Sequence, residues 1–237
     1  LYLLFMKFIG LFFLLFSFSS LFAQDELEWL KENKNDSLYR EDQFYFGFSF
    51  NFLTELPSDV EQSGFSGGLM FGYIRDMPIN KRRNLSIGLG LGFNLNTFGQ
   101  SLQVNSNAGQ DIFLPINPDR DYDVNRFTTN LVEVPLELRW RSSDIDKYAF
   151  WRVYLGVHVG YVFRFKSTFE SVEEKYTVTN VDALNSFRTS AKLTFGYGAI
   201  NFFVNMSLTP VFEGEIESTG ERVSLTPIKV GLVFFFL

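Results

Sequence analysis

The feature that most constrains this chain is the segment of residues 151–165, WRVYLGVHVGYVFRF. Its odd-numbered positions are all apolar or aromatic, whereas its even-numbered positions are mostly charged, polar or small. Side chains that alternate with a period of two belong to a β-strand with two different faces. At about 3.3 Å per residue, this strand is much longer than an ordinary strand.

The long aromatic face of this segment fits a lipid bilayer. In water, such a continuous apolar face is an aggregation hazard. A strand that crosses a membrane needs about 9–11 residues whose side chains alternate between lipid and lumen. The chain contains 30 Phe, 10 Tyr and 3 Trp residues, yet its mean hydropathy is only +0.03, which argues against a bundle of membrane helices. We therefore predict a transmembrane β-barrel.

The same alternation recurs along the chain and predicts eight strands. They span residues 44–53, 65–74, 85–96, 126–141, 151–165, 187–197, 200–212 and 225–237. Long polar loops and short turns alternate between them, as in outer-membrane barrels. We predict an all-β fold, an eight-stranded antiparallel up-and-down transmembrane β-barrel with both termini in the periplasm. A soluble β-sandwich is the alternative, but every strand here carries an aromatic face that would need a second sheet.

Aromatic residues mark one end of the predicted barrel. If the short turns are periplasmic, six outward-facing aromatic residues fall at the periplasmic ends of their strands. They are Phe44, Tyr73, Trp140, Trp151, Tyr197 and Phe236. Aromatic girdles of this kind lie at the membrane interfaces of β-barrels. The pattern also predicts that Trp140 and Trp151 lie near each other across one hairpin.

The opposite strand faces carry a network of charges. Eight strands close a lumen that is just wide enough to be filled by side chains. The predicted inward-facing residues are Glu133, Glu137, Arg139, Arg141, Arg152, His158, Arg164, Lys166, Arg188, Lys192 and Lys229. Buried unpaired charges are costly, so we expect a salt-bridged structural filling, with glycines leaving room for the long side chains. An ion path is the alternative. Pro135 removes one ladder donor and predicts a bulge.

The N-terminus is typical of a secreted protein. Residues 1–23 predict a signal peptide that starts at Met6-Lys7, has an apolar core at 8–18 and ends in Ala23. A single transmembrane anchor is the alternative, but no positively charged flank follows it. Residues 24–43 are polar and predict a flexible periplasmic segment. Residues 44–237 then form the barrel.

The sequence predicts no catalytic site, metal site or cofactor. His158 is the one histidine, and it stands in mid-strand on the lumen face, where it cannot reach a lipid ester. No Gly-x-Ser-x-Gly motif and no histidine pair occur. Residues 119–125 carry acids at alternate positions, as calcium loops do, but lack the glycine and the final glutamate of such a loop. We expect a solvated acidic loop there.

The formal charge and the cysteine content narrow the possible functions and modifications further. The net charge of −6 gives no electrostatic support for nucleic-acid binding. The chain has no Cys, so it has neither a disulfide nor a lipidated N-terminal cysteine.

Residues 130–141, NLVEVPLELRWR, resemble the E-x-P-x-x-x-R strand of PorT-type proteins, with Glu133, Pro135 and Arg139 at the motif positions. The Ala23-Gln24 junction, the Arg-x-Tyr-x-Gly of residues 152–156 and the apolar C-terminus fit the same group, and the resemblance covers about residues 44–237. It implies a small outer-membrane barrel of Bacteroidota, a Gram-negative group. The family's namesake is required for type IX protein secretion in a non-enzymatic role, and the family supplies no catalytic residues. The chain departs from the usual terminal Phe by ending in Leu237.

We therefore expect a non-catalytic barrel that is a structural or accessory component of an envelope machine, possibly the type IX system. Its partners would be outer-membrane lipid and envelope proteins that bind the 24–43 segment and the outer loops. A small passive pore and a lipid-modifying enzyme are the alternatives.

Overall fold

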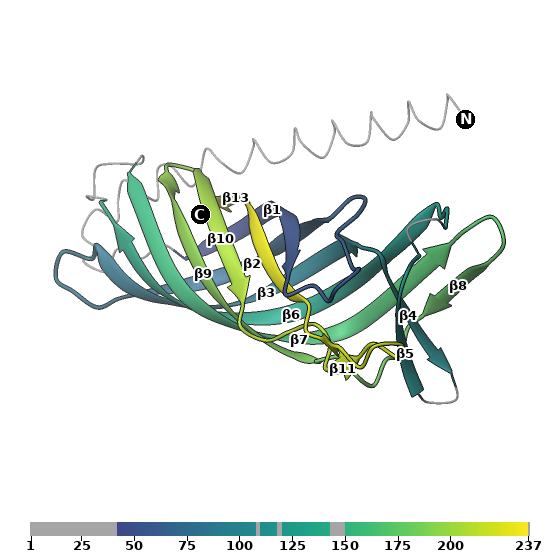
Figure 1. The fold of residues 1–237 in the computed structure, drawn as a ribbon. Helices are drawn as coiled ribbons and strands as arrows, with labels where there is room; N and C mark the ends of the chain where they lie inside the picture. The colour runs from purple at the N-terminus through teal and green to yellow at the C-terminus, as the bar shows by residue number, and fades with distance from the viewer. Residues whose placement is uncertain (1–41, 108–109, 118–119, 143–149, 237) are drawn as a thin grey trace, which may run out of the picture. The chain divides into compact units, whose positions relative to one another are not determined.

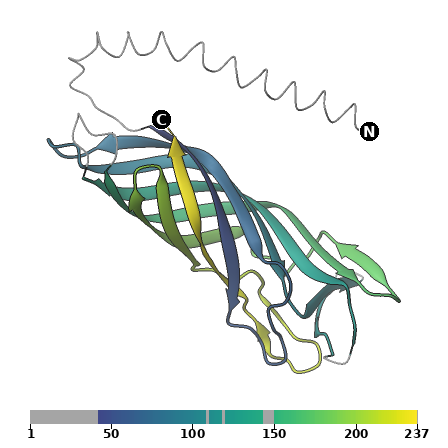
Figure 2. The same ribbon diagram turned by 90° about the horizontal axis from the view of Figure 1, so that it is seen from above.

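Eight long strands of this protein form one closed antiparallel barrel in the computed structural model, which describes residues 42–107, 110–117, 120–142 and 150–236 (Figures 1 and 2). The barrel strands are β1 (Gln43–Thr54), β2 (Gly67–Pro78), β3 (Leu85–Gly99), β6 (Val124–Arg141), β7 (Trp151–Glu170), β9 (Phe187–Tyr197), β10 (Ile200–Ser207) and β13 (Thr226–Phe236). Their order is β6-β3-β2-β1-β13-β10-β9-β7, and β6 pairs with β7 to close the barrel. The predicted fold class is confirmed. The predicted signal peptide and residues 24–41 lie outside the described residues.

The two ends of the barrel differ in their connections. We call the end where β1 begins and β13 ends the terminal end, and the opposite one the loop end. At the terminal end β9 turns into β10 through Gly198 and Ala199, and Gly198 has a φ of 60°, in the left-handed region that glycine favours. At the loop end, short extra strands form where the sequence predicted polar loops. They are β4 (Leu102–Asn107), β5 (Gln110–Pro115), β8 (Lys175–Val178), β11 (Gly214–Glu215) and β12 (Arg222–Val223).

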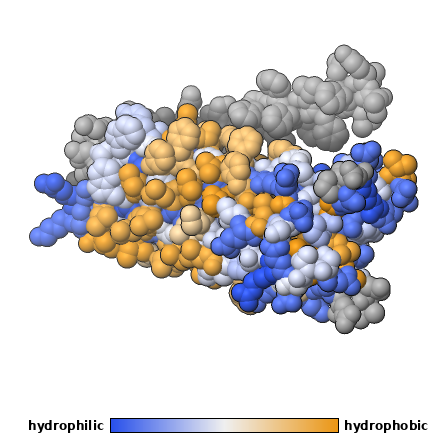
Figure 3. All heavy atoms as spheres, viewed as in Figure 1, coloured by the Kyte–Doolittle hydropathy of each residue, from blue (hydrophilic) through white to orange (hydrophobic). Residues whose placement is uncertain are grey.

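The outer wall of the barrel is apolar because side chains alternate along every strand. On β1 the even-numbered residues from Phe44 to Phe52 are exposed phenylalanines, whereas Tyr45, Gly47, Ser49 and Asn51 are buried in the interior. Exposed apolar residues of neighbouring strands stand side by side in the register, as Phe46 does with Phe71. Figure 3 shows the resulting apolar surface over the barrel strands, with hydrophilic residues on either side of it.

A β-bulge reverses the alternation near the loop end of β7. Asn130 of β6 faces Arg164 but the next residue, Leu131, faces Val162, so Phe163 is an extra residue on β7. An extra residue sends all later side chains to the opposite face. Phe165 is therefore buried, while Arg164 and Lys166 are exposed on the outer wall. The prediction that Arg164 and Lys166 point into the lumen is wrong for this reason.

The bulge predicted at Pro135 is also wrong. Pro135 faces His158 within the regular register of β6 and β7. On its other side, the pairing with β3 keeps one register on both sides of the proline, with Leu89 opposite Leu136 and Gly92 opposite Glu133. The missing N–H of Pro135 is thus accommodated without an inserted residue in either neighbouring ladder.

A hydrophobic cluster, which we call the loop-end cluster, fills the loop end of the barrel. It joins barrel residues such as Phe127 and Phe165 with residues of the loop hairpins such as Phe113 and Ile216. The predicted strand 200–212 is shorter in the structure, ending at Ser207, because Val211 and Phe212 turn into this cluster and are fully buried. Aromatic packing thus replaces strand pairing in this segment.

Candidate functional site

The charged residues of the lumen lie on inward-facing positions of five barrel strands. Nearly every predicted inward-facing charged residue is buried there, with Arg164 and Lys166 as the exceptions explained above. The buried ones are Glu133, Glu137, Arg139, Arg141, Arg152, His158, Arg188, Lys192 and Lys229. We call this set the lumen network and add Asp76, which was not among the predicted residues.

Asp76 is the centre of the network at the terminal end. Its side chain is 0% exposed. One carboxylate oxygen, Oδ1, accepts hydrogen bonds from Arg139 Nη1 at 3.0 Å and from Ser86 Oγ at 2.6 Å, and the other, Oδ2, accepts one from Arg141 Nη1 at 2.7 Å. Charge-assisted bonds of this kind are among the strongest in proteins. A single buried carboxylate therefore holds β2, β3 and β6 together.

The alternation of side chains in the sequence continues to Asp76, but the predicted strand ended before this residue. The second strand was predicted to end near Ile74, but β2 continues to Pro78. The inward alternation through Met70 and Ile74 reaches Asp76 at the next step. Continuing the predicted strand by two residues would have placed Asp76 on the inward face, in the same lumen as the predicted arginines.

The two arginines bound to Asp76 have further partners. Arg139 donates through Nη2 to Gln43 Oε1, and its guanidinium carbon lies 4.1 Å from the ring centroid of Tyr154. Arg141 donates through Nε to the carbonyl of Arg83 at 3.0 Å. The planar guanidinium group suits such combined hydrogen bonding and stacking. The terminal end of the lumen is therefore filled by arginines with several contacts each.

His158 lies between two carboxylates in the middle of the lumen. Its Nδ1 is 3.5 Å from Glu133 Oε2 and its Nε2 is 3.3 Å from Glu137 Oε1. The same oxygen of Glu133 accepts a hydrogen bond from Asn94 Nδ2 at 2.6 Å. Because the carboxylates lie on opposite sides of the ring, the imidazole links them within the β6–β7 sheet. The side chain is 4% exposed, so it does not present a basic nitrogen to lipid.

Glycines on β7 provide space for the two glutamates of β6. Gly156 faces Glu137 and Gly160 faces Glu133 in the register. A Cβ atom on Gly156 would lie 2.7 Å from Glu137 Cγ and 2.8 Å from the Leu136 carbonyl oxygen, whereas one on Gly160 would lie 3.0 Å from Glu133 Cγ. The close packing of strand and side chain therefore requires glycine most strongly at 156.

We expect Gly156→Ala to destabilise the barrel by about 1–3 kcal/mol, because the added methyl group overlaps Glu137 and a backbone oxygen. Gly160→Ala is the matched control and should cost clearly less, since the new Cβ would lie 3.0 Å from Glu133 Cγ and 3.4 Å from the nearest backbone oxygen, that of Val132. Urea unfolding of the refolded proteins in detergent measures both. Equal losses for the two variants would contradict the assigned packing.

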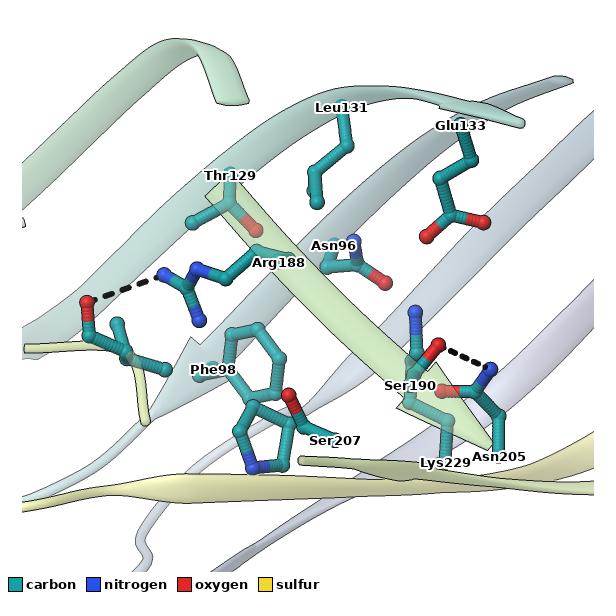
Figure 4. A pocket seen from close by; sticks show the side chains of 12 residues that line it. Asn96, Phe98, Thr129, Leu131, Glu133, Arg188, Ser190, Asn205, Ser207 and Lys229 are labelled. Carbon is teal, nitrogen blue, oxygen red and sulfur yellow. Dashed lines mark hydrogen bonds between the residues drawn. The ribbon is translucent and has the colours of Figure 1, made fainter. Parts of the chain in front are cut away.

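A small cavity separates the middle of the lumen from the loop-end cluster (Figure 4). Its volume is about 30 Å³, and its polar lining includes Glu133, Arg188, Ser190, Asn205 and Lys229. Arg188 donates to the carbonyls of Asn185 and Val211 at 2.6 and 3.1 Å, and Asn205 donates to Ser190 Oγ at 3.0 Å. A cavity of this size accommodates about one or two water molecules. At this level the lumen is lined by polar side chains together with apolar ones, among them Phe98, Leu131 and Val211.

Aromatic residues lie on the outer wall at both ends of the barrel. Trp151 contacts Tyr197 at the terminal end with a centroid distance of 5.5 Å, Phe44 contacts Tyr73 at 5.1 Å, and Phe236 faces Phe44. Trp140 is exposed at the same end, but it faces Val153 in the register and not Trp151. A second group, at the loop end, contains Phe65, Tyr161, Phe163 and Phe187, all exposed. An aromatic girdle was predicted from the sequence only at the terminal end.

The described part of the chain shows no group of three or more His, Asp or Glu residues that could hold a metal ion. Asp119 of the predicted acidic loop lies outside the described residues. Arg120 of the same loop forms an ion pair with Glu174 at 2.5 Å. Among the described residues, no helix is long and apolar enough to cross a membrane.

A closed barrel with an apolar outer wall, aromatic residues at both ends and a polar, filled lumen defines the class of small transmembrane β-barrels. A family model described as an outer membrane protein beta-barrel domain matches residues 22–213 of the chain. The chain belongs to this family, and its location is the outer membrane. No curated protein matched the chain.

Proposed function

We propose that this protein is a non-catalytic, non-conducting barrel that acts as an accessory component of an envelope machine. The observation that carries this proposal is the filled interior. The Asp76 network occupies the terminal end, apolar residues such as Tyr45 and Phe203 pack beside Lys192 in the middle, and the loop-end cluster fills the other end. A barrel with such an interior offers its outer wall, loops and termini for interactions.

The filled interior supports a closed barrel over the alternative of a passive pore. In planar bilayers the pure protein should give no steady channels, because ions would have to pass both buried salt bridges and the loop-end cluster. Incorporation into the bilayer is confirmed by recovering the protein from the same membranes. Reproducible channels of one conductance would overturn the non-conducting part of the proposal.

The position of His158 supports a non-catalytic role over that of a lipid-modifying enzyme. General-base catalysis requires the base within hydrogen-bond reach of the substrate, and this histidine is enclosed in the lumen between two glutamates. Lipid A from cells that carry a His158→Asn variant should therefore be identical in mass to lipid A from cells with the unaltered protein. A change in acylation or phosphorylation would favour the enzyme.

We further propose that the barrel is of the PorT type, from a member of the Bacteroidota, and serves type IX protein secretion. The motif residues Glu133 and Arg139 both have buried, paired side chains on β6, which is consistent with a structural role for the motif. A deletion strain should lose secretion of type IX cargo, and crosslinking in native membranes should recover other envelope proteins. Normal secretion together with no crosslinked partner would overturn the assignment.

We propose that the terminal end and both termini face the periplasm, in keeping with the usual long outer loops of such barrels. Because the chain has no Cys, single cysteines report exposure directly. Val172→Cys, at a 94% exposed position between β7 and β8, should react with a membrane-impermeant maleimide on intact cells. Asn80→Cys, in the turn between β2 and β3, should react only after lysis. The reverse result would invert the orientation.

A further inference from the structure

Three basic side chains lie together on the outer wall of the barrel at the loop end. Arg126 is exposed on β6, and Arg164 and Lys166 are exposed on the neighbouring strand β7. The register places Arg126 opposite Thr168, Lys166 opposite Thr128 and Arg164 opposite Asn130. We call these three charged residues the basic wall patch. The bulge at Phe163 creates it, because without the extra residue Arg164 and Lys166 would point into the lumen.

The basic wall patch lies just beyond the apolar band. The outward residues of β7 are apolar from Trp151 to Phe163, and those from Trp151 to Tyr161 are all exposed. Ten residue steps at about 3.3 Å, tilted by about 40°, span about 25 Å, which is the height of the apolar band of such barrels. Tyr161 contacts Phe187 at a centroid distance of 5.2 Å, and this aromatic pair lies at the limit of the band toward the loop end. Arg164 and Lys166 therefore stand at the level of the lipid headgroups.

No acidic side chain in the described residues neutralises the basic wall patch. Glu170, at the end of the same strand β7, binds Lys175 Nζ at 2.7 Å. None of the ion pairs formed within the described residues involves Arg126, Arg164 or Lys166. Their outward neighbours Thr128, Asn130 and Thr168 are neutral. The patch thus carries three positive charges that face an interface where lipids carry phosphate groups.

We propose that the basic wall patch binds the phosphate groups of lipid A in the loop-side leaflet. Arginine and lysine at the membrane interface place their charges at headgroup level while their aliphatic chains follow the apolar wall. Two guanidinium groups and one ammonium group from adjacent strands supply the positive charge and the hydrogen-bond donors that phosphate oxygens accept. In cells this contact also depends on the proposed orientation, in which the loop end faces outward.

The test uses the mature chain, refolded in detergent, and purified bisphosphorylated lipid A as the probe. The triple variant Arg126→Gln, Arg164→Gln, Lys166→Gln should bind lipid A at least about tenfold more weakly than the unaltered protein does. The reason is that each basic residue near an anionic lipid surface adds to the binding affinity. The matched control is Arg75→Gln, Lys81→Gln, Arg82→Gln, which removes three exposed charges at the terminal end. It should bind within about twofold of the unaltered protein. Added salt should weaken binding of the unaltered protein.

Equal binding by the triple variant and the unaltered protein would overturn the proposal, as would an equal loss in the control variant. Equal affinity for lipid A and its dephosphorylated form would also overturn it, because the phosphate would then play no part. A heat-dependent shift in gel mobility verifies that each variant is folded. The cysteine labelling described above tests the orientation separately, since binding in detergent does not depend on it.

Discussion

Replacing Asp76 with Asn is expected to destabilise the barrel by about 3–5 kcal/mol, the usual loss when one partner of a buried ion pair is removed. Asp76 binds Arg139 Nη1 at 3.0 Å and Arg141 Nη1 at 2.7 Å, and all three side chains are at most 1% exposed. The neutral amide keeps the size of the carboxylate but not its charge, so two guanidinium groups lose their common counterion. Urea unfolding in lipid vesicles, followed by tryptophan fluorescence, measures the change.

The exposed pair of Glu170 and Lys175 provides the control for this prediction. Its distance of 2.7 Å equals that of the shorter of the two Asp76 ion pairs, but the side chains of Glu170 and Lys175 are 37% and 64% exposed. Glu170→Gln should therefore cost less than about 1 kcal/mol. If Asp76→Asn costs no more than Glu170→Gln, the buried network does not stabilise the barrel as we infer.

Replacing Phe212 with Ala is expected to destabilise the loop end by about 3–5 kcal/mol, the usual loss for truncating a buried phenylalanine. Phe212 is fully buried, and its ring lies 5.3, 5.5 and 5.7 Å from those of Phe113, Phe127 and Phe165. The ring therefore joins the loop hairpins to β6 and β7. We expect proteases to cleave the β4–β5 and β11–β12 segments much faster in this variant, while the barrel strands remain protected.

Phe65→Ala is the matched control, because Phe65 belongs to the same end of the protein but is 74% exposed. Its proteolysis pattern should match that of the unaltered protein. Unchanged protease resistance in Phe212→Ala would show that the loop-end cluster does not hold the hairpins in place.

The strands and their faces could be predicted because the membrane imposes a period of two on each of them. The prediction for 187–197 coincides with β9, and that for Arg126–Arg141 differs from β6 by two residues at one end. The inward position of Glu133, Glu137 and Arg139 followed from the same alternation. In each case the pattern is local, and no contact between distant residues is needed to read it.

Other features of the site depended on contacts that the local pattern does not specify. Asp76 was missed because β2 extends past an apolar stretch, and its role becomes visible only beside Arg139 and Arg141 from another strand. Likewise, Val211 and Phe212 fall within the predicted strand 200–212, but both are fully buried in the loop-end cluster, where Phe212 packs against Phe113. Such residues can either pair with a neighbouring strand or pack in a hydrophobic cluster. Here the β4–β5 hairpin, which is distant in sequence, provides the cluster.

The sequence by itself determined that this chain is a membrane barrel of eight strands, because alternating polarity over a membrane-spanning length has few other stable solutions. Only the tertiary structure decided where that alternation breaks. The register of β6 against β7 inserts Phe163 as a bulge, and this one residue moves Arg164 and Lys166 from the lumen to the outer wall. A bulge is a property of two paired strands, so neither strand alone contains the information that fixes it.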